Sequence, residues 1–552
     1  MRHMLLASAM LLAMPIQADN LDNWQAGSVD SKPSTWWHWL DCNVTREGIT
    51  ADLEAMARMG YHEVQIFNAS NGLPTGNIQY LTPQWLEMLK WSAQEAERLG
   101  LTFCLHNCPG WSSSGGYWIK PEYSMQRLVW SETQLTGNGK EQTLQLAEPR
   151  KERDYYRDIR VIAFPTPQTD QRLPQYQLKS LGSQNFPDKM LPSDPKLPAS
   201  ATVRKADVQD ISAYMQPDGT LTWQAPAGQW TILRMGHTST GKDCHPTSPA
   251  TGGGLEVDKL SRKAMDEHWR GGIQPILDHL GPLAGKVLNN LLIDSYEVGC
   301  GNWTEGFDSE FRARRGYDCT PYLPAMAGFV VEDGLQSERF LWDWRKTVGQ
   351  LMADNYYTYF GDLCHQHGLK FCTEPYTGPF DDMEVGAPAD MVMGEFWVGS
   401  TGHTSMKVVS SIAHFNGQSV VGAESFTAAD PWTGWDGSPA RIKALGDLAW
   451  CEGINHYIYH TYVHQPYNVG PGFTLGPFAS HFNRLNTLWE PARAWHEYVQ
   501  RAQYLLQQGR FVGDILIFNG ESSPNDGLAR PEIKEMGFDY DEIWTAAITQ
   551  LR

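Results

Sequence analysis

Short apolar runs alternate along the chain with stretches whose hydrophobic residues recur every three or four positions. The runs predict strands, and the stretches between them predict helices. Eight strands are expected, at residues 35–40, 62–68, 101–107, 287–297, 369–374, 391–395, 419–424 and 456–464. Because strands that alternate with helices pair in parallel, the pattern predicts an α/β fold, a closed (β/α)8 barrel of the TIM type.

Helix boundaries support this pattern. Thr82 and Pro83 are typical of a helix start, since a threonine hydroxyl can accept from a free backbone N–H and proline needs no acceptor there. Glycines end three predicted helices just before an apolar strand, at Gly60, Gly100 and Gly368. This repeated connection indicates a repeated βα unit. A final long helix is expected at about residues 477–508.

The pattern changes in three places. Residues 1–18 have the layout of a secretory signal peptide, with Arg2 and His3 before an apolar stretch and the small residue Ala18 at the cleavage point. Residues 19–510 are assigned to the barrel, and a β-rich insertion at residues 112–237 interrupts it after the third strand. Residues 511–552 are expected to be the incomplete start of a C-terminal α/β domain. The protein is therefore expected to be exported to the periplasm, the cell surface or the medium.

Four glutamates, Glu297, Glu374, Glu395 and Glu424, each stand at the end of a predicted strand. In a parallel barrel the ligand binds beyond the C-terminal ends of the strands, so these side chains are expected to converge there. Burial and mutual repulsion tune carboxylate pKa values for acid/base chemistry. One strand-end glutamate is as often a structural partner as a catalyst, but four in one order favour an active site.

Other polar and aromatic residues fall at the same strand ends and in the loops that follow. Aromatic faces beside hydrogen-bonding groups suit a sugar, whose C–H face stacks while its hydroxyls need donors and acceptors. We therefore expect a carbohydrate partner. The candidate substrate-binding residues are His38, Asp41, Asn68, His106, Trp111, Glu374, Trp432 and His460.

Glycoside hydrolysis needs one carboxylic acid that protonates the leaving oxygen and one carboxylate that acts as base or nucleophile. Glu297 and Glu424 are on predicted strands four and seven, so they could face each other across a sugar. Glu374 and Glu395 would line the wall between them and bind hydroxyls or a cation.

Two longer motifs carry a family resemblance. The sequences WWHWLDCNVTRE at residues 36–47 and HNCPGWSSSGG at residues 106–116, with the strand ends at Glu297 and Glu424, resemble glycoside hydrolase family 106, the inverting α-L-rhamnosidases. The resemblance covers roughly residues 31–552. It implies a (β/α)8 catalytic barrel with β-rich additions, calcium in the active site with ligands that the sequence does not identify, and release of L-rhamnose from plant or algal polysaccharides or glycosides.

By strand order and local context, the resemblance makes Glu297 the general acid, Glu424 the general base and Glu395 a supporting carboxylate. An acid on strand four with a second carboxylate on strand seven is also the layout of many retaining barrel glycosidases. Those enzymes usually place asparagine directly before the acid, whereas Tyr296 precedes Glu297 here, which favours inversion. Family members continue into further C-terminal domains, so the chain is expected to be truncated.

Composition limits the partners. The chain of 552 residues has a formal net charge of -19 and no basic block, which argues against nucleic acid or an anionic membrane surface. No segment after the N-terminus offers the roughly 20 apolar residues that span a bilayer. Nine cysteines are odd in number and too sparse for a disulfide framework, and their spacing does not favour zinc.

Two other functions remain open from the sequence. One is a barrel glycosidase of another sugar specificity. The other is a non-catalytic carbohydrate-binding protein, which the presence of all four glutamates disfavours.

Overall fold

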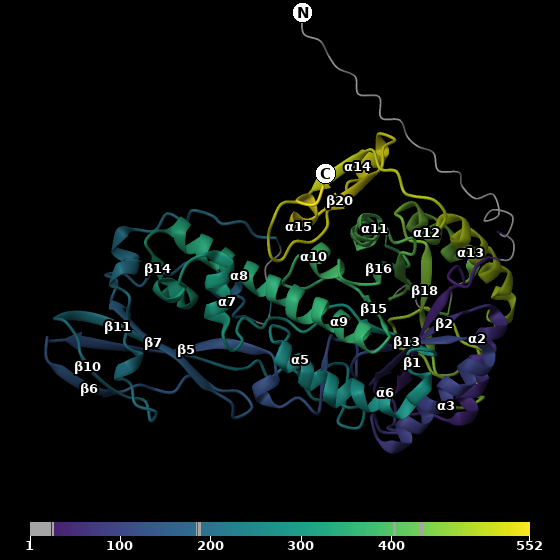
Figure 1. Cartoon of the computed structure of the whole chain (residues 1–552), viewed down its shortest axis with the longest axis horizontal. Coiled ribbons are helices and arrows are strands. Elements are labelled where there is room, and N and C mark those ends of the chain that lie inside the picture. Colours follow the sequence, from purple (N-terminus) through teal and green to yellow (C-terminus); the bar gives the residue numbers. More distant parts are fainter. Residues whose placement is uncertain are drawn as a thin grey trace, which may run out of the picture.

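The computed structural model describes residues 24, 27–183, 185, 189–400, 405–429, 434–435 and 437–551. Eight parallel strands close into a barrel in the order β1-β18-β17-β16-β15-β13-β3-β2 (Figure 1). These strands are β1 (Ser34–Leu40), β2 (Glu63–Ala69), β3 (Thr102–His106), β13 (Leu288–Ile293), β15 (Lys370–Thr373), β16 (Met391–Trp397), β17 (Gly422–Thr427) and β18 (His456–Val463). All eight predicted strands are present, and the (β/α)8 prediction is confirmed.

Helices surround the barrel (Figure 1). The helices of this part of the chain are α2 (Arg46–Met59), α3 (Pro83–Leu99), α5 (Arg262–His268), α6 (Gln274–Leu280), α7 (Phe307–Arg315), α8 (Gly334–Met352), α9 (Tyr359–Gln366), α10 (Asp382–Gly386), α11 (Ser405–Asn416), α12 (Pro439–Cys451) and α13 (Arg493–Leu506). Of these, α7 packs on α8 and lies toward the β-rich region, away from the barrel strands (Figure 1). The boundaries of α3 follow from its sequence. The Thr82 hydroxyl accepts from the N–H of Trp85, and Gly100 ends the helix with a φ of 71°, which glycine adopts without strain.

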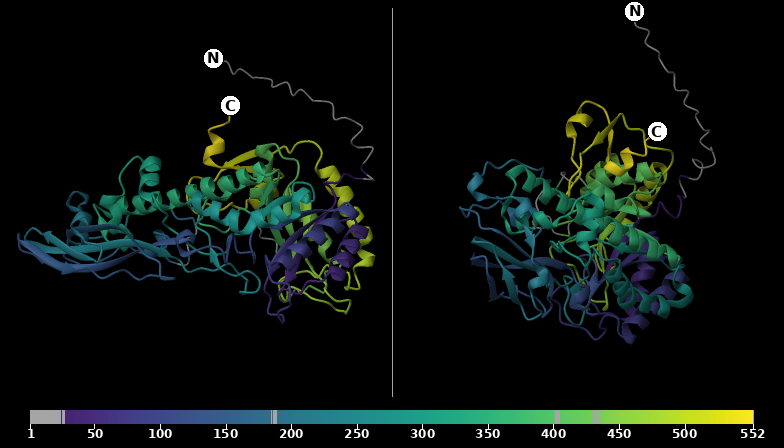
Figure 2. Two further views of the ribbon diagram at one scale, coloured as in Figure 1. Left: turned by 60° about the horizontal axis from the view of Figure 1, so that its bottom comes forward. Right: turned by 60° about the vertical axis from the view of Figure 1, so that its left-hand side comes forward.

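A β-rich region joins β3 to β13 and projects away from the barrel (Figure 2). Its four-stranded sheet has the order β5-β11-β7-β9, and β10 pairs separately with β6. A separate core of buried apolar residues, among them Val161, Leu221 and Ile232, stabilises it. The strands are β5 (Gln126–Gly137), β6 (Glu141–Gln145), β7 (Arg157–Pro165), β9 (Gln209–Asp210), β10 (Thr220–Gln224) and β11 (Gly228–Ser239). The insertion expected after the third strand is therefore present in the fold, while its exact boundaries stay a prediction.

Shorter elements complete this part of the chain. The pairs β4 with β12 and β8 with β14 form two-stranded sheets, and the first pair lies where the insertion rejoins the barrel. These elements are β4 (Gly115–Gly116), α4 (Tyr176–Lys179), β8 (Thr202–Val203), β12 (Leu255–Glu256) and β14 (Val330–Val331).

The structure corrects three expectations about the elements. β13 ends at Ile293, four residues before Glu297, and Glu395 and Glu424 lie within β16 and β17 rather than at their ends. The long final helix begins only at Arg493, as α13. Pro491 lies in a short 3-10 helix, Glu490–Ala492, directly before α13, because a proline is accommodated at the start of a helix and not in its interior.

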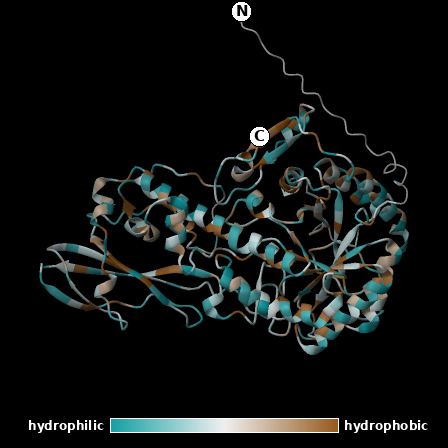
Figure 3. Cartoon of the chain, in the orientation of Figure 1, coloured by the Kyte–Doolittle hydropathy of each residue, from teal (hydrophilic) through white to brown (hydrophobic). Residues whose placement is uncertain are grey.

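The last described residues form a small parallel unit. β19 (Ile515–Phe518) pairs with β20 (Tyr540–Ile543), α14 (Pro531–Glu535) lies between them in the chain, and α15 (Thr545–Ile548) follows. The arrangement is strand, helix, strand, and the assignment of residues 511–552 to a larger C-terminal α/β domain stays a prediction. Part of the ribbon of this unit is coloured as hydrophobic (Figure 3), and Leu516 is 51% exposed.

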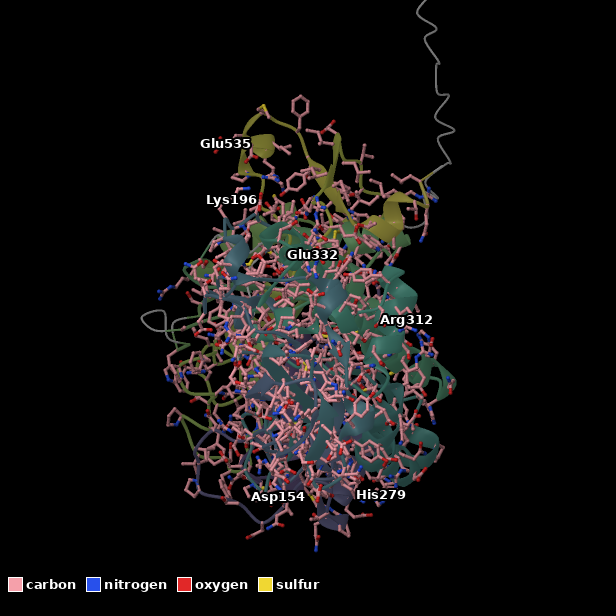
Figure 4. The ribbon with its side chains drawn as sticks, turned by 90° about the vertical axis from the view of Figure 1, so that its left-hand side faces the viewer. Asp154, Lys196, His279, Arg312, Glu332 and Glu535 are labelled. Carbon is pink, nitrogen blue, oxygen red and sulfur yellow. The ribbon has the colours of Figure 1, made fainter. Side chains whose placement is uncertain are left out.

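All nine cysteines are described; none forms a disulfide, and all but Cys451 are buried. Charged side chains such as Asp154, Arg312 and Glu535 lie at the edge of the molecule (Figure 4). Within the described residues, no helix is long and apolar enough to cross a membrane. The predicted signal peptide and Trp432 lie outside the described residues.

Candidate active site

A cavity of about 270 Å³ opens at the C-terminal ends of the barrel strands. Its wall combines carboxylates with aromatic and apolar side chains, and none of the described lining residues is Lys or Arg. The lining residues are Trp36, His38, Trp111, Asp294, Ser295, Glu297, Glu395, Trp397, Glu424, Thr427, His460, Leu475 and Phe478. Three of the four predicted glutamates therefore meet at one cavity.

Glu297 is the exposed carboxylate of the cavity. It follows β13 in a loop whose backbone is held by an N–H···O bond of 3.4 Å from Glu297 to the carbonyl of Ser112. The Ser295 hydroxyl donates to its Oε1 at 3.3 Å. Its side chain is 43% exposed, so a large substituent can approach it from solvent.

Glu395 and Glu424 lie side by side on neighbouring strands. They are paired residues in the register of β16 and β17, so their side chains point to the same face. The indole N–H of Trp397 donates to Glu395 Oε2 at 2.9 Å, and the hydroxyl of Thr427 donates to Glu424. Burial, and then the negative charge of Glu395, raises the pKa of Glu424 well above its usual range.

Asp294 and Glu374 lie beside Glu424 and complete a carboxylate cluster. One oxygen of each of the three carboxylates lies within 4.8 Å of the others. Burial raises the pKa of Asp294 to about 7, and burial together with Asp294 raises that of Glu374. Tyr376 donates to Glu374 Oε2 at 2.5 Å, while Glu374 Oε1 and Asp294 Oδ1 are buried without a hydrogen-bond partner. The two carboxyl groups can share a proton, and when that proton is lost their oxygens can bind a cation.

β1 supplies one side of the cavity. Trp36 and His38 alternate along the strand and therefore face inward, whereas Trp37 and Trp39 face the surrounding helices. Phe67 on β2 stacks against Trp36 at 4.4 Å and against His38 at 4.9 Å, which fixes both rings. Trp36 thus lines the cavity.

The two predicted cavity histidines are uncharged. Burial lowers the pKa of His38, and burial lowers that of His460 to about 3. His38 Nδ1 pairs with the hydroxyl of Thr461 at 2.7 Å, and its Nε2 is buried without a partner. His460 Nδ1 lies 3.4 Å from Glu424 Oε1. Neutral imidazoles can hydrogen-bond sugar hydroxyls as donors or acceptors.

Three other predicted substrate-binding residues are not among the cavity lining. Asp41 accepts the backbone N–H groups of Asn71 and Leu73 and thereby holds the loop after β2. Asn68 donates to the carbonyl of Thr251, and His106 pairs through Nδ1 with the carbonyl of Cys108. These contacts position loops around the cavity. Glu374 is buried below the wall, and Trp111 and His460 do line it.

Sequence reasoning missed several cavity residues. Asp294 had a visible signal, because it directly follows the apolar run that forms β13. Phe478 lies in the stretch for which the sequence predicts a helix, and Leu475 lies just before it. His245 is not among the lining residues, but its Nε2 lies 3.4 Å from Glu297 Oε2; it follows the predicted insertion, and its sequence context gives no signal for this contact.

A parallel eight-stranded barrel whose C-terminal mouth holds clustered carboxylates among aromatic rings has the architecture of a barrel glycosidase. Residues 26–551 match the glycoside hydrolase family 106 profile, described as alpha-L-rhamnosidase, so the chain belongs to that family. The resemblance seen in the sequence is confirmed.

Two known proteins are similar to this chain. The structure of a rhamnosidase from Novosphingobium sp. PP1Y superposes with a TM-score of 0.85 at 28% identity, covering 96% of this chain and 65% of that one. A protein of Formosa agariphila named "Putative beta-glucuronidase" is 51% identical over 522 residues, which cover 94% of this chain and 44% of that protein. The chain thus spans less than half the length of that relative and under two thirds of the rhamnosidase.

Proposed function

We propose that this protein is an exo-acting glycoside hydrolase that releases L-rhamnose from α-L-rhamnosides by single-displacement inversion. One observation carries the proposal. The exposed carboxyl group of Glu297 and the buried one of Glu424 line the same aromatic-lined cavity, and their strands are three apart in the barrel order. Family membership supports the same activity.

Glu297 is proposed as the general acid. Its exposure at the cavity rim suits contact with the leaving group, which must extend out of the site toward solvent. In single displacement this carboxyl group gives its proton to the glycosidic oxygen as the C–O bond breaks.

Glu424 is proposed as the general base. A raised pKa means a strong affinity for the proton that the attacking water loses. The hydroxyl of Thr427 holds the carboxylate in place, His460 Nδ1 lies 3.4 Å from it, and Glu395 beside it adds negative charge. Water then forms a bond to the anomeric carbon on the face opposite the leaving group.

We propose that a calcium ion binds at Asp294 and Glu374. Their buried oxygens without hydrogen-bond partners are the oxygen ligands that calcium prefers, and Glu424 has no such oxygen. The bound ion would offset the negative charge of the cluster and bind sugar hydroxyls. Chain residues that fix this pair are Tyr376, which donates to Glu374, and the end of β13, which places Asp294.

The cavity lining favours a neutral sugar. Rhamnose carries a methyl group, for which Trp36, Leu475 and Phe478 offer apolar contacts. The name of the Formosa relative suggests a glucuronide as the second candidate substrate. A glucuronate carboxylate would enter a site rich in carboxylates whose described lining has no lysine or arginine, so rhamnose is preferred.

The test is turnover of aryl glycosides, with proton NMR of the first-formed sugar. We expect the parent to hydrolyse an aryl α-L-rhamnoside in preference to a β-D-glucuronide and to release the β anomer first. Glu297→Gln and Glu424→Gln should each lower kcat by about 10²-fold or more. Variants within a few-fold of the parent would refute the assignment, and binding without sugar release would indicate a carbohydrate-binding protein.

We also propose that the protein is exported, on the basis of the signal-peptide pattern at residues 1–18. N-terminal sequencing of the protein recovered from the producing cells should then begin after Ala18. A mature chain that still begins at Met1 would contradict export by this route.

A further inference from the structure

His245 is the side chain that contacts the proposed acid from outside the barrel. Its Nε2 lies 3.4 Å from Glu297 Oε2, and the two side chains are 46% and 43% exposed. Both side chains are therefore accessible to solvent, and Glu297 also lines the cavity. This inference rests on the proposed acid role of Glu297.

A buried network fixes the backbone of His245. Its carbonyl accepts the N–H groups of Trp111 and Ser112 at 2.9 and 3.1 Å, and its own N–H donates to the Ser112 hydroxyl at 2.9 Å. That hydroxyl donates in turn to Glu256, which forms an ion pair with Lys259 inside the protein. The imidazole is thus attached to a rigid support.

The same network holds Glu297. The carbonyl of Ser112 accepts the N–H of Glu297, so one residue positions the backbones of both members of the pair. Gly110 allows this close approach: a Cβ added there would lie 2.4 Å from the carbonyl oxygen of His245. The contact between imidazole and carboxyl group therefore follows from a packed arrangement of three chain segments.

The charges around the pair favour a proton on it. The hydrogen bond with Glu297 raises the pKa of His245, the charge of Glu256 acts in the same direction, and Lys242 opposes them. On the cavity side, Glu297 faces Asp294, Glu395 and Glu424, whose pKa values its negative charge raises.

We propose that His245 stores the catalytic proton of Glu297. With one proton on the pair, the imidazolium passes its Nε2 proton to Glu297 Oε2 and becomes neutral imidazole. The resulting carboxylic acid gives that proton to the glycosidic oxygen as the C–O bond breaks, and Glu297 returns to carboxylate. Solvent water or buffer acid then reprotonates the imidazole. His245 is thus a positioning residue that keeps the acid supplied at neutral pH.

His245→Gln tests this, because glutamine can hydrogen-bond Glu297 but cannot carry the proton. On an aryl α-L-rhamnoside with a poor leaving group, kcat/KM should fall about 10-fold or more at pH 7.5 and much less at pH 5. The basic limb of the pH profile should move to lower pH. With a 2,4-dinitrophenyl leaving group, which needs no proton, the variant should resemble the parent.

His365→Gln is the matched control. His365 Nε2 pairs with Asp390 Oδ2 at 2.8 Å, and the two side chains are 50% and 36% exposed, similar to the His245 pair. This variant should keep the parent pH profile. If His245→Gln lowers kcat/KM by the same factor at every pH and for both leaving groups, His245 has a purely structural role and the proposal is overturned.

An NMR titration of His245 separates this proposal from the proposed function. The imidazole pKa should be lower in Glu297→Gln than in the parent, because the variant removes the negative partner. An unchanged pKa overturns the proposal whatever the activity. If Glu297→Gln keeps full turnover while the imidazole pKa does fall, the acid assignment fails but the coupling of the pair stands.

Discussion

At the scale of single residues, the site gathers anionic groups without a neighbouring cation among the described lining residues. Asp294, Glu374 and Glu424 lie together, and Glu395 stands beside them. Like charges at such distances cannot all stay ionised unless protons or a metal ion offset them. Burial, and then this repulsion, raises the pKa values of the three groups.

The cluster predicts calcium binding that depends on two residues. Calcium should raise the melting temperature of the parent, because a ligand that binds the folded state stabilises it. Asp294→Asn and Glu374→Gln should each lower calcium affinity by about tenfold or more, measured by isothermal titration calorimetry. Asp390→Asn, at the opposite end of the barrel, is the control and should bind calcium like the parent. An equal calcium affinity in the parent and all three variants would contradict a calcium site at Asp294 and Glu374.

Asp258 predicts a pH-dependent stability. Burial raises its pKa to about 7, although the Thr304 hydroxyl and the Leu260 N–H donate to it. The folded state therefore binds this proton more tightly than the unfolded state. Its contribution to stability is full below pH 4 and is lost as the pH rises through about 7, by at most about 1.4 kcal/mol per pH unit.

Asp258→Asn should remove that dependence. Urea unfolding of parent and variant at pH 5 and pH 8 measures it, and the variant should gain stability relative to the parent at pH 8. A stability difference that is the same at both pH values would contradict a raised pKa.

At the scale of elements, loops rather than strands bring the acid and its partner together. Three segments meet there: the loop after β3, the return from the insertion, and the loop after β13. Gly110 stands at their contact, with a φ of 74°.

Gly110→Ala should therefore lower kcat by a larger factor than its effect on stability alone explains. Its added Cβ would push on the carbonyl of His245, and small displacements of catalytic groups can cost about 10²-fold in rate. Gly100→Ala is matched to it, since Gly100 has a φ of 71° and nothing within 4 Å of an added Cβ. Both should lose about 1–2 kcal/mol of stability from the left-handed backbone, but only Gly110→Ala should lose kcat. Equal kcat in both variants would contradict this role of the glycine.

These loops also mark the limit of sequence-based prediction. Strand and helix positions follow from local periodicity, and Gly60, Gly100 and Thr82 mark helix ends in the chain itself. The cavity glutamates followed from strand order. The contact of His245 with Glu297 could not be predicted in this way. The position of His245 depends on how the chain returns from the insertion, and contacts between residues far apart in the sequence determine that return.

The segment after β18 shows the same limit in another form. The sequence predicts one helix from about residue 477, whereas Phe478 lines the cavity together with Leu475 just before it, and α13 begins only at Arg493. Hydrophobic periodicity predicts which residues are buried, but it does not predict which part of the protein they pack against.

At the scale of the whole molecule, the two-stranded sheet of β19 and β20 is incompletely covered. Parallel strands are usually buried on both faces, yet Ile515, Leu516 and Phe518 are 38%, 51% and 46% exposed. Exposed apolar strands promote association.

Leu516→Lys should reduce self-association of the chain. Light scattering across a concentration series should show a smaller mean mass for the variant than for the parent, while kcat on the same substrate stays unchanged. Val29→Lys, at another exposed apolar position that is 51% accessible, controls for the added charge. If both variants lower the mean mass by the same amount, β19 has no specific role in self-association.

The place of the insertion affects how the chain folds. β3 and β13 are neighbours in the barrel, but β3 ends at His106 and β13 begins only at Leu288. β5 and β11 pair along their full length, from Gln126 with Ser239 outward, so this hairpin-like sheet brings the two ends of the insertion together. Once this sheet has formed, it shortens the effective length of the loop between β3 and β13. Pairing of these two strands then costs less conformational entropy. Early folding of the insertion would therefore speed completion of the barrel.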